Sequence, residues 1–178
     1  METQNATTPE VNNPVTARSV GLRHGLILGL VSIIFSLILI LIGDSPFNRS
    51  ISWVNWVFVI ALVVIAHKRF KDGNNGYMSY GQGVGISFWI SLASTVLGGI
   101  FLYIYITAID PGLFDAVFEQ QIQAMEEKGM PDDQIEMGIN IGKMMFWPMY
   151  LIGGIFCGVL IGLIVSIFTQ KKAPEQLY

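Results

Sequence analysis

Residues 144–168, MMFWPMYLIGGIFCGVLIGLIVSIF, decide the fold of this chain, because the stretch contains no Asp, Glu, Lys, Arg or His. It is longer than the roughly 20 residues that an α-helix needs to cross the hydrocarbon core of a bilayer. Inside that core no water satisfies the backbone N–H and C=O groups, so a spanning segment must be helical. The stretch therefore predicts a transmembrane helix.

Three earlier runs, residues 25–43, 50–66 and 84–109, also lack Asp, Glu, Lys and Arg. Each is long enough to span a bilayer, the second only narrowly. Hydrophobic residues make up 52% of the chain and charged residues 13%. A typical soluble domain has about 25% charged residues, so this composition excludes a soluble enzyme and a disordered chain. We predict an all-α integral membrane bundle of four transmembrane helices, forming one domain over residues 18–170.

The ten Lys and Arg residues are divided unevenly between the two sides of the predicted bundle. Positive residues in short loops favour the cytoplasmic side, so we expect both termini there, as tails 1–17 (disordered) and 171–178. The cytoplasmic set is Arg18, Arg23, Lys68, Arg69, Lys71, Lys171 and Lys172. The outer set is Arg49, Lys128 and Lys143. Aromatic residues that suit the headgroup level mark the same outer side: Trp53, Trp56, Tyr103, Tyr105, Trp147 and Tyr150.

Small residues recur at every fourth position in three of the four predicted helices, which places them on one face of each helix. Such a face lets two helix backbones approach closely, which favours helix association in lipid. We call these rows of small residues ladders. The ladder residues are Gly21, Gly25, Gly29, Gly83, Ser87, Ser91, Thr95, Gly99, Gly154, Gly158, Gly162 and Ser166. We expect close crossings among the first, third and fourth helices.

The ladders have two interpretations, packing within one bundle and a homodimer interface, and we favour the first. The helix at 50–66 has no ladder, so it is expected at the periphery of the bundle. Its Asn55 is expected to hydrogen-bond to a neighbouring helix. Pro148 is expected to kink the last helix, because proline has no N–H to donate.

Residues 110–143 separate the third and fourth predicted membrane helices, and their pattern predicts a helical hairpin on the outer side. Asp110 and Pro111 are typical of a helix start. Apolar residues then recur at spacings of three and four: Leu113, Phe114, Val117, Phe118, Ile122 and Met125. A second helix is expected to begin at Pro131 and to run into the last membrane helix. We expect the apolar face of the hairpin to rest on the membrane surface or to cap the bundle, with docking of a partner protein as the alternative.

Methionine is concentrated in the hairpin and at the start of the last helix. Most of the eight methionines lie there: Met125, Met130, Met137, Met144, Met145 and Met149. Flexible apolar packing is the favoured interpretation. Binding of Cu(I) by the thioethers is the alternative.

Ionisable residues are missing from the middle of every predicted membrane helix, which argues against a pump or a proton-coupled carrier. No set of acid, base and nucleophile indicates an enzyme, and no spacing predicts a metal or cofactor site. His24 and His67, at the cytoplasmic helix ends, are expected to be interface anchors. Lys68, Arg69 and Lys71 form a basic cluster, interpreted as a topology signal, with binding of anionic lipid headgroups as the alternative.

Three stretches carry a resemblance to a known family: RHGLILGLVSIIFSLILILIG (23–43), HKRFKDGNNGYMSYGQGVGISFWISLASTVLGGIFLYIY (67–105) and FEQQIQAMEEKGMPDDQIEMG (118–138). The chain resembles, over residues 18–170, the bacterial membrane-protein family called domain of unknown function 4199. The resemblance implies four helices in the bacterial cytoplasmic (inner) membrane. It implies no activity, cofactor or catalytic residue.

Together these observations predict a non-enzymatic accessory or scaffold subunit of a bacterial envelope process. An oligomeric transporter or channel for a lipid or a small neutral solute is the second hypothesis. The expected partners are membrane lipids and either further copies of the chain or another membrane protein. A net charge of −3 does not suit a nucleic-acid-binding protein.

Overall fold

The computed structural model describes residues 15–43 and 51–173. Over these residues the chain is helical, with one isolated pair of bridged residues and no strand. The elements are α1 (Ala17–Leu41), α2 (Ser52–Asp72), α3 (Tyr80–Ile104), the π-helical turn η1 (Tyr105–Ile109), α4 (Gly112–Glu126) and α5 (Asp132–Thr169). Most of the two predicted tails, together with Arg49, lies outside the described residues.

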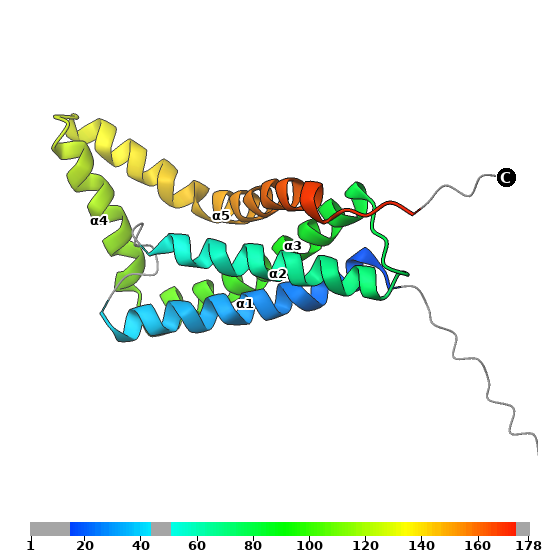
Figure 1. Cartoon of the computed structure of the whole chain (residues 1–178). Coiled ribbons are helices and arrows are strands. Elements are labelled where there is room, and N and C mark those ends of the chain that lie inside the picture. The colour runs from blue at the N-terminus through cyan, green and yellow to red at the C-terminus, as the bar shows by residue number, and fades with distance from the viewer. Residues whose placement is uncertain (1–14, 44–50, 174–178) are drawn as a thin grey trace, which may run out of the picture.

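Four of the described helices are long and apolar enough to cross a membrane: α1, α2, α3 with η1, and α5. The predicted all-helical bundle of four transmembrane helices is therefore confirmed. Figure 1 shows α4 at one end of the bundle, joined to the first part of α5. We call this end the hairpin end. The opposite end, where α1 and α3 begin and α2 and α5 end, is the tail end.

The helices extend beyond the apolar runs that predicted them. α1 begins at Ala17, where the Thr16 hydroxyl accepts a hydrogen bond of 3.1 Å from the Ser19 N–H. α5 begins at Asp132 and continues to Thr169, so the second hairpin helix runs into the last membrane helix as predicted. Scarcity of charge marks the segment that lies in hydrocarbon, whereas capping residues set where a helix ends. The sequence pattern therefore located the membrane segments better than the helix ends.

α3 lies between α1 and α5 and is the central helix of the bundle. In the described parts of α1 and α5, no Cα atom of one helix comes within 8 Å of the other. The expectation of close crossings among all three ladder helices therefore needs correction. α1 and α5 each pack on α3, and they do not pack on each other.

The ladders of α3 and α5 face each other along an antiparallel seam. Each small residue on α3 lies against one on α5, with both rows advancing four residues at a time. The pairs are Gly83–Ser166, Ser87–Gly162, Ser91–Gly158 and Thr95–Gly154. A Cβ atom added at Gly154 would lie 2.7 Å from Thr95 Oγ1, which leaves no room for a larger residue. This seam is packing within one chain.

The glycine ladder of α1 packs on the other side of α3. A Cβ atom added at Gly25 would lie 2.6 Å from the carbonyl oxygen of Ile90. One added at Gly29 would lie 2.8 Å from the Leu97 side chain. Both helices run in the same direction here, because residue numbers rise together on the two sides. Close backbone approach thus holds α3 from both sides.

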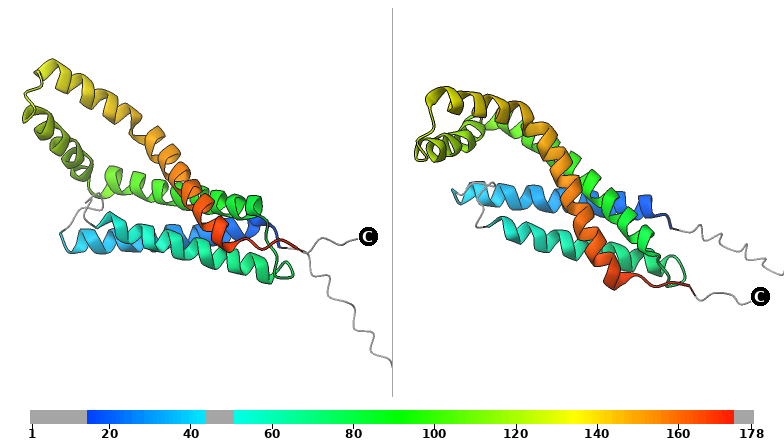
Figure 2. Two further views of the ribbon diagram at one scale, coloured as in Figure 1. Left: turned by 45° about the horizontal axis from the view of Figure 1, so that its top comes forward. Right: turned by 90° about the horizontal axis from the view of Figure 1, so that it is seen from above.

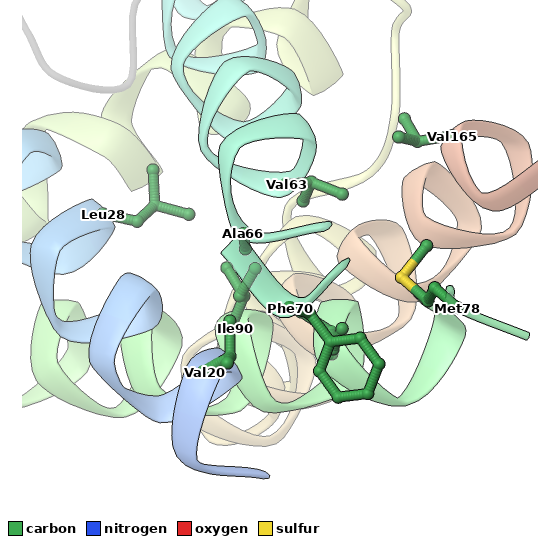
Figure 3. Packing of buried hydrophobic residues seen from close by; sticks show 9 residues of the cluster. Val20, Leu28, Val63, Ala66, Phe70, Met78, Ile90 and Val165 are labelled. Atoms are coloured by element: carbon green, nitrogen blue, oxygen red, sulfur yellow. The ribbon is translucent and has the colours of Figure 1, made fainter. Parts of the chain in front are cut away.

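α2 was expected at the periphery, and the structure confirms this only for its hairpin-end half, where Trp53 and Val57 are exposed. The tail-end half is part of the core. Figure 3 shows its side chains packed among those of α1, α3 and α5. The buried α2 residues are Val63, Ala66, His67 and Phe70. Their spacing of three and four residues forms one face of a helix.

α5 contains Pro148 within its length, and Figure 2 shows that the helix changes direction in its middle part. Proline removes one backbone hydrogen bond and its ring displaces the preceding turn. α5 therefore packs on α3 in its tail-end half and leans away from the bundle in the other half.

The seam predicts that alanine substitutions at two glycines of α5 have different effects on the stability of the protein. Gly158→Ala places a methyl group against Ser91, and we expect a loss of about 1–3 kcal/mol from overpacking. Gly153→Ala meets no atom within 4 Å, so it should leave stability unchanged or raise it by up to about 1 kcal/mol. Thermal unfolding in detergent measures both.

The double variant with Gly158→Ala and Ser91→Gly supplies the control, because Ser91→Gly removes the side chain that the new methyl group meets. We expect the double variant to recover part of the lost stability. Equal unfolding midpoints for Gly158→Ala and Gly153→Ala would contradict the seam.

Candidate functional site

A cleft opens between the helices in the hairpin-end half of the bundle. It consists of two adjoining cavities of about 390 and 330 Å³, and both are lined by Ser32, Asn55, Gly98 and Tyr150. The inner cavity reaches Leu28, Cys157 and Gly158, and the outer one reaches Ile40, Tyr105 and Leu113. The cleft therefore runs from the middle of the membrane helices toward the hairpin.

Tyr150 explains where the seam ends. It occupies the α5 ladder position that follows Gly154, opposite Gly99 on α3. A Cβ atom added at Gly99 would lie 3.2 Å from Tyr150 Cε1. A large ring thus lies where the ladder would need a small residue. Pro148 lies two residues before Tyr150, toward the hairpin end of α5. The seam stops at this point and the two helices diverge.

Uncharged polar groups line the cleft. The Ser32 hydroxyl donates a hydrogen bond of 3.0 Å to Asn55 Oδ1, which joins α1 to α2 and agrees with the bond predicted for Asn55. The Ser94 hydroxyl donates to the Ser91 carbonyl oxygen at 3.2 Å within its own helix. Of the described residues that line the two cavities, none is Asp, Glu, Lys, Arg or His. The cleft suits a neutral or apolar occupant.

The aromatic residues predicted at the outer interface divide into two groups. Trp53, Trp56 and Tyr103 are exposed and Trp147 is partly exposed, as an interface position requires, although Trp56 also lines the inner cavity. Tyr105 is buried, and Tyr150 is partly buried beside Gly98 and Gly99. The sequence pattern did not separate the cleft residues from the exposed ones, because both groups lie at the same height on their helices.

The tail end is closed by a buried polar cluster around His67. Its Nε2–H donates to the Gly83 carbonyl oxygen at 3.0 Å, and its Nδ1 lies 2.7 Å from Thr169 Oγ1. Lys71 Nζ donates to the Thr169 carbonyl oxygen at 3.0 Å. The His67 side chain thus connects α2 to α3 and α5. We call His67, Lys71, Thr169 and the Gly83 carbonyl the latch.

Two further contacts close the same end. Met78 and Lys171 exchange backbone hydrogen bonds of 2.8 and 2.9 Å, which tie the residues before α3 to those after α5. Asn74 Nδ2 donates to the Val15 carbonyl oxygen at 3.0 Å, next to the start of α1. The tail ends of all four membrane helices are therefore connected.

The histidines were predicted to be interface anchors, and this is wrong. His67 is fully buried, and His24 is buried with its Nδ1 2.8 Å from the Val20 carbonyl oxygen of its own helix. The signal for His67 was its place in the apolar α2 row with Val63, Ala66 and Phe70. A polar group on a buried face needs hydrogen-bond partners, and the latch provides them.

Ser166 occupies a buried seam position beside Gly83. Within the described residues, its Oγ is the buried side-chain atom that lacks a hydrogen-bond partner. Its small size is what the seam requires, because a larger residue would meet α3.

The basic cluster is divided by the structure. Lys68 and Arg69 are exposed at the tail end. Lys71 is half-buried and bonds to the latch. Of the three residues, only Lys68 and Arg69 are therefore in a position to contact lipid headgroups.

Four apolar helices, a small-residue seam and a neutral cleft define a multi-pass helical membrane protein. The family model described as a protein of unknown function, DUF4199, matches residues 23–171. The chain therefore belongs to this family, as the sequence resemblance implied. Comparison with curated proteins and with solved structures found no match.

The latch predicts unequal roles for the two buried histidines. His67→Leu leaves the Thr169 hydroxyl without its partner on α2 and cuts the links from α2 to α3 and α5, so we expect a loss of about 1–3 kcal/mol. His24→Leu removes one bond within a single helix and should cost clearly less. Thermal unfolding in detergent compares them, and equal losses would contradict the role of the latch.

Proposed function

We propose that this protein is a non-enzymatic accessory or scaffold subunit of the bacterial cytoplasmic membrane, and that its cleft receives a helix of another membrane protein. The observation that carries the proposal is the cleft itself. Small residues and uncharged polar residues line it together with apolar side chains, and the latch and the seam close it at the tail end.

The chemistry of the lining favours a helix as the occupant. In lipid, helices associate through close packing of small residues and through hydrogen bonds between helices, because lipid tails are as apolar as leucine. Gly98, Gly153 and Gly154 supply small surfaces in the cleft, and Ser32 and Asn55 supply polar groups. A Cβ atom added at Gly153 meets nothing within 4 Å, so space is open beside this backbone.

The second candidate is an oligomeric transporter or channel for a lipid or small neutral solute. The observation in its favour is that the cleft reaches Gly158 and Leu28, well inside the bundle. Passage to the tail end would require the seam and the latch to separate. The accessory role needs no such opening, and for this reason we prefer it.

The charges of the chain support a cytoplasmic location for both termini. Lys68 and Arg69 are exposed at the tail end, and Lys171 and Lys172 follow α5 at the same end. Acidic residues are concentrated in the hairpin: Asp115, Glu119, Glu126, Glu127, Asp132, Asp133 and Glu136. The basic residues at the tail end follow the positive-inside rule, to which acidic residues contribute little.

Cysteine labelling in intact cells tests this orientation. In a Cys157→Ala background, Gln123→Cys on the exposed side of α4 should react with a membrane-impermeant maleimide. Gln170→Cys, exposed at the tail end, should react only after the cells are permeabilised. The reverse pattern would overturn the proposed orientation.

Photo-crosslinking tests the occupant of the cleft. A crosslinking amino acid at Ser94, which lines the cleft, should give a defined adduct with a different membrane protein in native membranes. The matched control is Val96, two residues along α3 and exposed on its outer side. Position 96 should give only lipid adducts.

The adducts also separate the two candidate functions. Adducts between two copies of the chain at position 94 would support the oligomeric transporter instead. Only lipid adducts at both positions would contradict the accessory role.

A further inference from the structure

α5 is much longer than a bilayer requires. Its 38 residues span about 57 Å at ~1.5 Å per residue, whereas the hydrocarbon core is about 30 Å thick. The first half of the helix, from Asp132 to about Pro148, therefore extends beyond the membrane segment at the hairpin end.

An exposed apolar row follows α5 from this outer half into the membrane segment. Its members recur at spacings of three and four: Met137, Ile141, Met144, Pro148, Ile152 and Phe156. Met137 at 60% exposure is as open as Phe156 at 61%, although Phe156 belongs to the part that faces lipid. No charged residue interrupts the row. The surface that meets lipid in the membrane thus continues without a break onto the hairpin.

The opposite side of the same half-helix is covered by α4. Ile135 and Ile139 form a buried cluster with Phe118. A Cβ atom added at Gly142 would lie 3.1 Å from the Phe118 ring. The Lys143 side chain also points toward α4, because its Nζ lies 3.4 Å from Asp115 Oδ1. The apolar stripe of α4, expected to rest on the membrane surface or to cap the bundle, packs largely against α5 inside the hairpin.

The hairpin has two unlike free faces as a result. On α4 the free side carries Glu119, Gln123 and Glu126, all exposed. On α5 the free side carries the row that begins at Met137 and Ile141. Such a two-sided element is typical of structures that lie at the boundary between water and lipid.

An aromatic cluster joins the hairpin to the bundle. Phe114 of α4 and Phe146 of α5 have ring centroids 5.0 Å apart, and Trp147 lies 5.8 Å from Tyr103 of α3. Figure 2 shows α5 leaning away from the other helices, with α4 on the side toward the bundle. The exposed row therefore faces away from the bundle, over the lipid that surrounds it.

We infer that the hairpin lies obliquely on the outer bilayer surface, with Met137, Ile141 and Met144 inserted at the level of the lipid headgroups and upper acyl chains. The partner of this face is lipid, because the face is continuous with the lipid-facing side of α5. Flexible methionine side chains adapt to such a disordered environment. The inference is independent of what occupies the cleft.

Fluorescence quenching in nanodiscs tests the inference with the full-length chain, one copy per phosphatidylcholine disc, in a Cys157→Ala background. A bimane label at Ile141→Cys should be quenched by lipids carrying a shallow spin label. This quenching should be several-fold stronger than for a label at Gln123→Cys on the polar face. Iodide in the water should give the reverse order. Ile164→Cys, exposed in the membrane segment, gives the reference for full contact with lipid.

Two results would overturn the inference. If iodide quenched Ile141→Cys as strongly as Gln123→Cys, the face would lie in water. If neither quencher reached the label at 141, protein would cover the face. Met137→Cys gives a second test of the same face, and unchanged unfolding midpoints show that the labelled variants are folded.

Discussion

The rest of the structure depends on the close approach of α3 and α5 along their seam. Lipid provides no hydrophobic drive for two helices to associate, so the backbones must come close enough for extensive van der Waals contact. Glycine on α5 makes this possible by receiving Ser87, Ser91 and Thr95 from α3. The Ser91 hydroxyl donates to the Ser87 carbonyl oxygen of its own helix at 2.8 Å, so at this position the seam holds a polar side chain whose hydrogen bond is satisfied. The other side of α3 is taken by the glycines of α1, which makes α3 the centre of the bundle.

The cleft, the latch and the hairpin all follow from where this seam lies. It ends where Tyr150 replaces a small residue, and beyond that point α5 leaves α3. The cleft lies beside this end of the seam, since its inner cavity also reaches Ser91, Gly154 and Gly158. At the tail end the seam continues to Ser166 and Gly83, where His67 adds links from α2. The bundle is therefore rigidly connected at one end and divided at the other. The same departure of α5 from the bundle carries the hairpin outward and turns the methionine row toward lipid.

Sequence patterns predicted the architecture because membrane helices obey simple rules of length, charge and periodicity. The four spans, the hairpin, the bond of Asn55 and the continuity of α5 could all be inferred from residue order. The burial of His67 was signalled only by its place in the apolar row of α2. The inward position of Tyr150 could not be inferred, because it depends on which face of a helix meets its neighbours. The apolar stripe of α4, expected to rest on the membrane or to cap the bundle, instead packs mainly on α5, since periodicity identifies an apolar face without naming its partner. The sequence pattern indicated no catalytic set of residues, so the proposed function was argued from the cleft.

Disulfide trapping of α3 against α5 is the most direct test of the seam. In a Cys157→Ala background, we would combine Thr95→Cys with Gly154→Cys, because a Cβ atom at 154 would lie 3.4 Å from that of Thr95. Natural disulfides have Cβ atoms about 3.5–4.5 Å apart. Oxidation in native membranes should therefore link the two cysteines within one chain, while Thr95→Cys with Gly153→Cys should remain reduced. A link between two chains, or preferential linkage of the 95–153 pair, would contradict the seam and the architecture that depends on it.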